Sequence, residues 1–139
     1  MHENRREVYV EWGDCDPAGI VFYPRFFEYF DACSAALFAS VGANIHEMQR
    51  SGEIAGIPMV DIRASFHKPV LFGTTVEIAS TISEFGRSSF TIQHRLFQTD
   101  ELAVEVFETR VWTEPSADGP GGLRAAPVPG AIVKSLSGA

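Results

Sequence analysis

The first patterned segment of the chain, VYVEWGD, alternates apolar and polar side chains. Val8, Val10 and Trp12 fall on one side of an extended chain, and the residues between them fall on the other. This period of two is typical of a half-buried β-strand. Gly13 follows, so we predict a strand that ends at this glycine.

From Pro24 onward the apolar residues recur at spacings of three and four, the period of an amphipathic helix. Proline suits the first turn of a helix because its missing N–H has no partner there, and Gly42 suits the end. The predicted helix over residues 24–41 is about 27 Å long. Its apolar positions are Phe26, Phe27, Phe30, Cys33, Leu37, Phe38 and Val41.

A short second helix and four long strands follow. Asn44 with Glu47 fits an N-cap with an acidic residue three positions later, and Gly52 ends this predicted helix. From residue 59 the chain is rich in Val, Ile, Thr and Phe, which favour strands. The predicted strands cover residues 59–70, 74–85, 88–100 and 102–114.

Short turns join the later strands, and Pro115 to Gly122 reads as a loop. The turns at Gly86 and Arg87 and at Thr99 to Glu101 are short enough to require antiparallel hairpins. The order of elements predicts an α+β fold with an antiparallel sheet curved around the long helix. One such helix covers only part of the sheet, so we expect strand-edge pairing with a second copy, as a homodimer or a homotetramer.

Composition narrows the classes of function. The chain has 139 residues, which is the usual size of one domain, and a formal net charge of −7, which disfavours nonspecific nucleic-acid binding. No apolar run approaches the roughly 18 residues of a membrane span. We therefore expect a cytoplasmic protein with no nucleic-acid or membrane partner. Two cysteines and four histidines show no metal-ligand spacing, so we expect no metal site.

The segment GDCDPAGIVFYPRFFEYFDACS resembles the signature of the hotdog-fold acyl-CoA thioesterases, in particular the 4-hydroxybenzoyl-CoA thioesterase family. Weaker similarity continues through GIPMVDIRASFHKPVLFGTTVEI and EFGRSSFTIQHRLF, so the resemblance covers about residues 7–114. It implies a single hotdog domain over residues 1–139, in which an antiparallel sheet wraps a central helix. It also implies hydrolysis of an acyl-CoA substrate with no cofactor.

The resemblance assigns two catalytic groups. Asp16 matches the catalytic carboxylate, which either attacks the thioester carbonyl or activates a water as general base. The backbone N–H of Tyr23, at the start of the long helix, matches the donor to the oxyanion. A helix N-terminus suits this task because its first N–H groups are unpaired and its dipole favours negative charge.

The other residues of the acidic loop have simpler interpretations. We interpret Asp14 as a structural acceptor for loop amides and Cys15 as a packing residue, because no histidine lies nearby in sequence to activate the thiol. Gly19 is expected to contribute to the substrate site through close backbone approach or a positive φ, although an ordinary turn glycine fits as well.

Asp31 stands on the long helix beside Phe30, where a carboxylate needs a partner. In the aromatic thioesterases that the chain resembles, the matching residue reaches the acyl pocket and accepts a hydrogen bond from a ring hydroxyl. A structural carboxylate bonded to a loop or a second subunit is the alternative. Glu28 is an alternative base, because another branch of hotdog thioesterases carries its catalytic Glu on the central helix.

The phosphates of CoA require basic or hydroxyl groups at the mouth of the site. The segment with Arg87, Ser88 and Ser89 resembles the one with which the family contacts CoA, although Gly86 and Ser88 stand where the aromatic type carries basic residues. Lys68 is a second candidate. A solvated turn arginine and a charged strand end explain the two cations equally well.

Two other functions compete with thioester hydrolysis. A hotdog hydratase or dehydratase needs a catalytic histidine, but the chain has neither an Asp-x-x-x-x-His segment nor a Gly-His-Phe-Pro-like motif. A noncatalytic thioester-binding protein would have no use for Asp16. The sequence therefore favours an acyl-CoA thioesterase.

Overall fold

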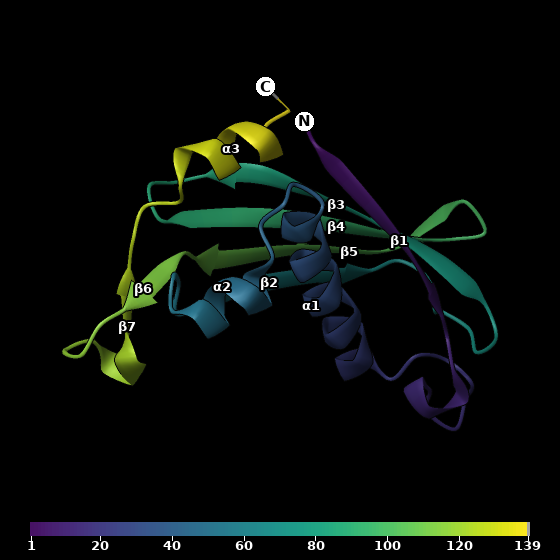
Figure 1. The fold of residues 1–139 in the computed structure, drawn as a ribbon. Coiled ribbons are helices and arrows are strands. Elements are labelled where there is room, and N and C mark those ends of the chain that lie inside the picture. Colours follow the sequence, from purple (N-terminus) through teal and green to yellow (C-terminus); the bar gives the residue numbers. More distant parts are fainter. Residues whose placement is uncertain (139) are drawn as a thin grey trace.

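The protein is described by a computed structural model that covers residues 1–138, and its main feature is an antiparallel sheet curved around one long helix (Figure 1). The sheet has five strands in the order β1-β3-β4-β5-β2. The strands are β1 Glu3–Tyr9, β2 Met59–Phe66, β3 Thr75–Phe85, β4 Ser89–Gln98 and β5 Glu101–Val111. The helices are α1 Tyr23–Ala39, α2 Ile45–Ser51 and α3 Gly130–Leu136, and β6 Thr113–Pro115 pairs with β7 Leu123–Ala125.

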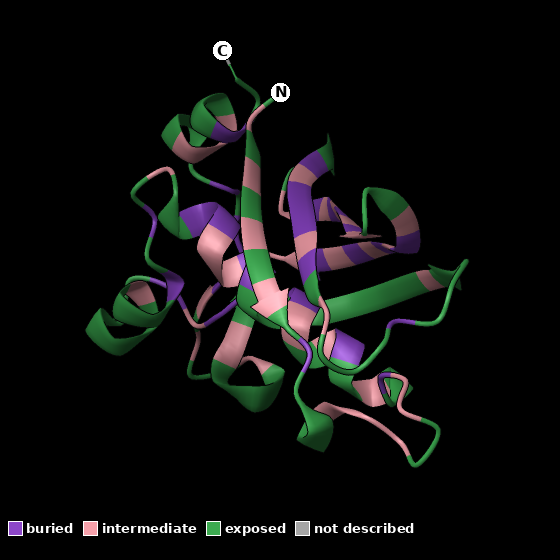
Figure 2. Cartoon of the chain, turned by 90° about the vertical axis from the view of Figure 1, so that its right-hand side faces the viewer, coloured by how far each residue is buried: buried purple, intermediate pink, exposed green. Residues whose placement is uncertain are grey.

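Helix α1 supplies the centre of the core, as its apolar spacing predicts. Phe26, Phe30, Cys33 and Leu37 are all buried against the sheet, and buried residues gather where α1 meets the strands (Figure 2). The helix ends at Ala39, two residues before the predicted end. The described helices include none with the length and hydropathy of a membrane span.

The predicted caps of α2 and the predicted hairpins are confirmed. The Asn44 side chain accepts a hydrogen bond from the Glu47 N–H at 3.1 Å, and Gly52 ends the helix with φ 83°. In the β4–β5 hairpin, Thr99 and Asp100 both have positive φ, the conformation of a type I′ turn that matches the strand twist. All neighbouring strands of the large sheet are antiparallel.

The predicted N-terminal strand was placed too late in the chain. Strand β1 ends at Tyr9, and Trp12–Asp14 forms a 3₁₀ turn in which the Asp14 side chain accepts the Glu11 N–H. Val10 is buried, as the alternation required, but Trp12 is exposed. The true strand begins at Glu3, where charged residues on a sheet edge carry no apolar period to detect.

The C-terminal region is more ordered than its loop-like composition indicates. The predicted loop over residues 115–122 lies mostly inside the β6–β7 hairpin, and helix α3 follows it. Leu136 of α3 is buried with Ala126 and Val128 in the core near Phe38. Only seven residues long, α3 is formed by this tertiary packing and has little intrinsic stability.

Candidate active site

The acidic loop between β1 and α1 is closed on itself and tied to the sheet. Cys15 and Val21 form a β-bridge, and within it the Asp16 N–H donates to the Ile20 carbonyl at 2.9 Å. Gly19 has φ +79°, so the expectation of a positive φ is confirmed. Its carbonyl accepts the N–H of Phe72 at 2.9 Å. These bonds hold the loop in one conformation before α1 begins.

Asp16 is half-buried in this loop and keeps part of its carboxylate available. Its Oδ1 accepts the Ala18 N–H at 2.8 Å, as expected for an Asp in a tight turn. Within residues 1–138, no donor reaches Oδ2. The turn therefore orients the carboxylate through one oxygen and leaves the other for chemistry.

Asp14 is engaged in structure through its backbone carbonyl and one carboxylate oxygen, in agreement with its interpretation. Its Oδ2 accepts the Tyr29 hydroxyl at 2.7 Å, and its carbonyl accepts the Phe22 N–H at 2.8 Å. Burial, together with the hydrogen bond to Asp14, raises the pKa of Tyr29 well above its usual value. Tyr29 remains a donor at every working pH, so the loop is anchored to α1.

Cys15 is placed as a packing residue. Its thiol donates to the Glu11 carbonyl at 3.5 Å. Burial raises the pKa of Cys15, and the charges of Asp14 and Asp16 raise it further. Because the nucleophilic form of cysteine is the thiolate, this environment disfavours thiol catalysis.

Tyr23 is the first residue of α1, and its backbone N–H is unpaired within the described residues. Phe22 precedes it with extended geometry and offers no side-chain cap, while Pro24 has no N–H. The next N–H along the helix, that of Arg25, bonds to the Phe22 carbonyl at 2.8 Å. The helix therefore begins with a single free donor, as an oxyanion site requires.

A cavity of about 260 Å³ opens beside Tyr23. Ile20, Tyr23, Phe26, Phe66 and Lys68 are among the residues that line it, so the structure brings together two of the predicted site residues, Tyr23 and Lys68. Lys68 also forms an ion pair with Glu101 at the β4–β5 turn. The cavity is predominantly apolar, with its charge at the rim.

Asp31 lies at a second cavity of about 360 Å³. The partner expected for its carboxylate is Arg110, whose Nη2 donates to Asp31 Oδ1 at 2.9 Å. The Asp31 side chain is nevertheless 72% exposed, whereas that of Arg110 is 8% exposed. Glu28, the alternative base, instead pairs with Arg25 at 2.9 Å on the exposed side of α1.

Behind Arg110 lies a buried polar network that sequence reasoning missed. His94 Nε2 lies 2.7 Å from Glu108 Oε1, and Ser34 Oγ donates to the same oxygen at 2.7 Å. His94 Nδ1 lies 2.6 Å from Ser80 Oγ, and Arg110 donates to Glu108 Oε2 at 3.0 Å. Burial alone would raise the pKa of Glu108, but the hydrogen bond from His94 and the charge of Arg110 lower it below its usual value.

A signal for this network was present in the strand patterns. In β5 the inward positions alternate through Val104, Val106, Glu108 and Arg110, and in β4 His94 occupies the inward position between two buried apolar residues. Charged residues at inward positions of an alternating strand need a buried partner.

The hairpin residues that were predicted to contact CoA lie at the end of the sheet far from Lys68. Arg87 and Ser88 form the β3–β4 hairpin beside α3, and their carbonyls accept the N–H groups of Val128 and Trp112. Strand β4 separates this hairpin from the end of the sheet near Lys68 by about 33 Å. The hairpin therefore does not meet the α1 N-terminus within one chain (Figure 1).

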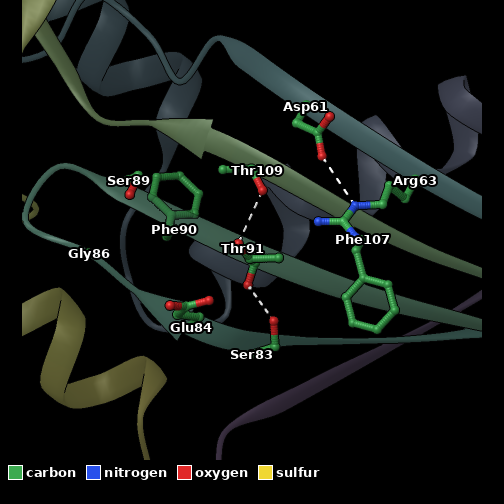
Figure 3. A pocket seen from close by; sticks show the side chains of 10 residues that line it. All are labelled: Asp61, Arg63, Ser83, Glu84, Gly86, Ser89, Phe90, Thr91, Phe107 and Thr109. Atoms are coloured by element: carbon green, nitrogen blue, oxygen red, sulfur yellow. Dashed lines mark hydrogen bonds and ion pairs between the residues drawn. The ribbon is translucent and has the colours of Figure 1, made fainter.

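Ser89 borders a third cavity, of about 500 Å³, on the outer face of the sheet. Figure 3 shows its hydroxyl-rich floor, where the Oγ1 atoms of Thr91 and Thr109 lie 3.2 Å apart. The ion pair of Arg63 with Asp61 lies at the edge of this cavity. This face is turned away from α1, because the inward residues of β4 and β5 are the buried ones.

Comparison with known proteins agrees with this geometry. The chain is 31% identical to 4-hydroxybenzoyl-CoA thioesterase of Pseudomonas sp. (strain CBS-3) over 92% of its own length and 93% of that protein. The fold also matches a crystal structure of 4-hydroxybenzoyl-CoA thioesterase, an aspartate-to-asparagine mutant in complex with 4-hydroxybenzoyl-CoA. The TM-score is 0.88 at 28% identity, and the match covers 98% of this chain and 99% of that one.

A gentisyl-coenzyme A thioesterase structure matches with a TM-score of 0.83 at 28% identity, covering 94% of this chain and 99% of that one. Residues 10–136 match the thioesterase-like superfamily. The family and the hotdog fold expected from the acidic loop are thus confirmed. The chain belongs to the thioesterase-like superfamily and is a thioester hydrolase of the hotdog fold.

Proposed function

We propose that the protein hydrolyses an acyl-CoA thioester, with Asp16 as the reacting carboxylate and the Tyr23 N–H as the oxyanion donor. The observation that carries this proposal is the free N–H of Tyr23, which begins α1 directly after the loop that orients Asp16. A thioester needs only an oxygen nucleophile and a donor to its carbonyl oxygen, and these two groups supply both.

Two routes fit the same pair of groups. In the first, Asp16 attacks the carbonyl carbon, the C–S bond breaks to release CoA thiolate, and water hydrolyses the resulting mixed anhydride. In the second, Asp16 removes a proton from the water that attacks. In both routes negative charge develops on the carbonyl oxygen, where the Tyr23 N–H and the positive end of the α1 dipole stabilise it.

Asp16 is the carboxylate of choice because its neighbours are engaged elsewhere. Asp14 accepts bonds from Tyr29 and Glu11, and Glu28 pairs with Arg25. The relative crystallised with its intact thioester carries asparagine in place of an aspartate, which supports a carboxylate mechanism.

We propose a hydroxylated aromatic acyl group as the substrate class. The relatives include thioesterases for 4-hydroxybenzoyl-CoA and gentisyl-CoA, both of which carry ring hydroxyls. Asp31 stands eight residues after Tyr23 on α1, which separates the two by about 12 Å along the axis. Its carboxylate is open to solvent beside a cavity, a suitable acceptor for a ring hydroxyl.

We further propose that the working unit is a dimer at least. Strand β2 is an edge of the sheet, and its side chains Met59, Val60, Ile62 and Phe66 are exposed. An apolar edge strand of this kind favours pairing with a second copy. The β3–β4 hairpin that carries Arg87 lies about 33 Å from the end of the sheet near Lys68. We therefore propose that Arg87 and the Tyr23 N–H contact one CoA from different subunits.

The test of the proposed function is release of CoA thiol from a panel of aromatic and aliphatic acyl-CoA thioesters, measured with a thiol reagent. We expect the fastest release from hydroxybenzoyl-type thioesters. Hydrolysis of none of the panel would overturn the activity, and a preference for long aliphatic chains would overturn the aromatic assignment alone.

A further inference from the structure

Arg110 joins three walls of the cavity at Asp31. Its Nη2 donates to Asp31 Oδ1 on α1 at 2.9 Å and to Glu108 Oε2 on β5 at 3.0 Å. Its Nη1 donates to the Ile57 carbonyl, in the segment before β2, at 3.1 Å. One guanidinium thus crosslinks the helix, the sheet and the segment between them.

The position of this guanidinium is itself determined by the core. Glu108 is 1% exposed and takes further hydrogen bonds from His94 and Ser34, so its carboxylate cannot move to follow Arg110. His94 is in turn enclosed by Ser80 and by the ring of Phe30, with 5.2 Å between ring centroids. The planar fork of the arginine is therefore presented to Asp31 in one orientation.

The arrangement is poorly suited to stability alone. The Nε of Arg110 is buried and has no hydrogen-bond acceptor within residues 1–138, and an unpaired buried donor is unfavourable. Buried ion pairs contribute little net stability, because desolvation offsets their attraction. What the network does provide is a fixed direction for an otherwise exposed carboxylate.

Asp31 is held through one oxygen and open at the other. Its Oδ1 is occupied by Arg110, while no donor reaches Oδ2 within the described residues. An exposed aspartate without such a clamp would sample several rotamers and would lose that freedom on binding a ligand. The clamp removes this cost before the ligand arrives.

We propose that Arg110 is a positioning residue for substrate specificity: it orients Asp31 so that Oδ2 accepts the hydroxyl of a hydroxylated aromatic acyl group. This inference rests on the proposed function, which assigns the acyl end of the thioester to Asp31. Arg110 touches no reacting atom, and it acts only through Asp31.

The experiment compares binding of 4-hydroxybenzoyl-CoA and benzoyl-CoA by calorimetry, in protein that carries Asp16→Asn so that the thioester stays intact. The hydroxyl preference is the ratio of the two affinities. It is measured for Arg110→Lys, for Asp31→Asn and for both together, with Arg124→Met as the control. Arg124 pairs with Glu114 on the surface, and it is not among the residues that line the cavity.

We expect Arg110→Lys to reduce the hydroxyl preference by about fivefold or more, because lysine keeps the charge and loses the fork. The effect should vanish in the Asp31→Asn background, since coupled residues are not additive. The control should keep the preference. A purely structural role would lower the melting temperature and leave the ratio unchanged.

If Arg110→Lys does not fold, the pair Glu108→Gln with Arg110→Gln removes both buried charges together and should also lose the preference. The inference is overturned if the ratio of the two affinities is unchanged in either variant, or if Arg110→Lys reduces it equally with and without Asp31. It is also overturned if the Asp16→Asn protein binds both thioesters equally well. If the Asp16→Asn protein still releases thiol, the proposed role of Asp16 is overturned instead. In that case the hydroxyl preference is measured as the ratio of kcat/KM for the two thioesters in the same variants.

Discussion

Tyr29 donates its hydroxyl to Asp14 Oδ2 at 2.7 Å, and this bond connects the second turn of α1 to the loop that precedes it. The Asp14 carbonyl also accepts the N–H of Phe22, the residue before the helix. Asp14 and Asp16 stand two residues apart, but their carboxylates are held differently: that of Asp14 is bonded to α1 through Tyr29, and that of Asp16 accepts an N–H within its own turn.

Replacement of Tyr29 by Phe should weaken this connection. We expect the free energy of unfolding to fall by about 1 kcal/mol, because Asp14 loses a donor while part of its carboxylate remains solvated. The kcat should fall as the loop loosens. Thermal unfolding and thiol release check both effects. Tyr9→Phe is the control, since Tyr9 is 55% exposed, and an unchanged Tyr29→Phe protein would show that the bond is dispensable.

Asp16→Asn should reduce kcat by about 100-fold or more, because asparagine keeps the shape and removes the nucleophile or base. The affinity for the thioester should change little. Cys15→Ser is the matched control and should keep most activity, since the proposed mechanism gives the thiol no chemical role. Near-normal turnover by Asp16→Asn, or an equally deep loss in folded Cys15→Ser, would contradict the assignment.

Acid should destabilise the protein through Glu108. The pKa of Glu108 in the folded protein lies below its ordinary value of 4.5, so its contribution to stability is complete above that value and is lost as the pH falls toward the folded pKa. We expect the melting temperature to decrease once the pH drops below about 4.5. The Glu108→Gln protein should be less stable at neutral pH, and its melting temperature should decrease less on acidification. The check is thermal unfolding from pH 7 to about pH 3. Equal acid sensitivity in both proteins would count against Glu108 as the group.

A lysine on the β2 edge should disrupt assembly. Ile62 is partly exposed on this edge, and a symmetric interface would contain the substitution twice. We expect Ile62→Lys to raise the dissociation constant of the dimer by about tenfold or more, measured by light scattering over a dilution series, with loss of activity at low concentration. Ser83→Lys, on β3, is the control. An active wild-type monomer would contradict the dimer proposal.

Features that depend on near neighbours in the chain were predictable. The spacing of Phe26, Phe30 and Leu37 identified α1, and Asn44 with Glu47 identified the start of α2, because caps and helical faces are formed by residues three or four apart. The family followed from the acidic loop in the same way, since its ordered residues lie within one continuous segment.

Features that depend on distant residues were decided only by the tertiary structure. The Asp31–Arg110 contact joins residues 79 positions apart, and no local period carries that information. Helix α3 is stabilised by burial of Leu136 against a core assembled from the whole chain. The sequence by itself determined that α1 begins close to Pro24, since proline suits the first turn of a helix. Only the packing of β5 on α1 decided what holds Asp31, because the buried guanidinium of Arg110 takes its partners from whatever residues the fold places opposite it.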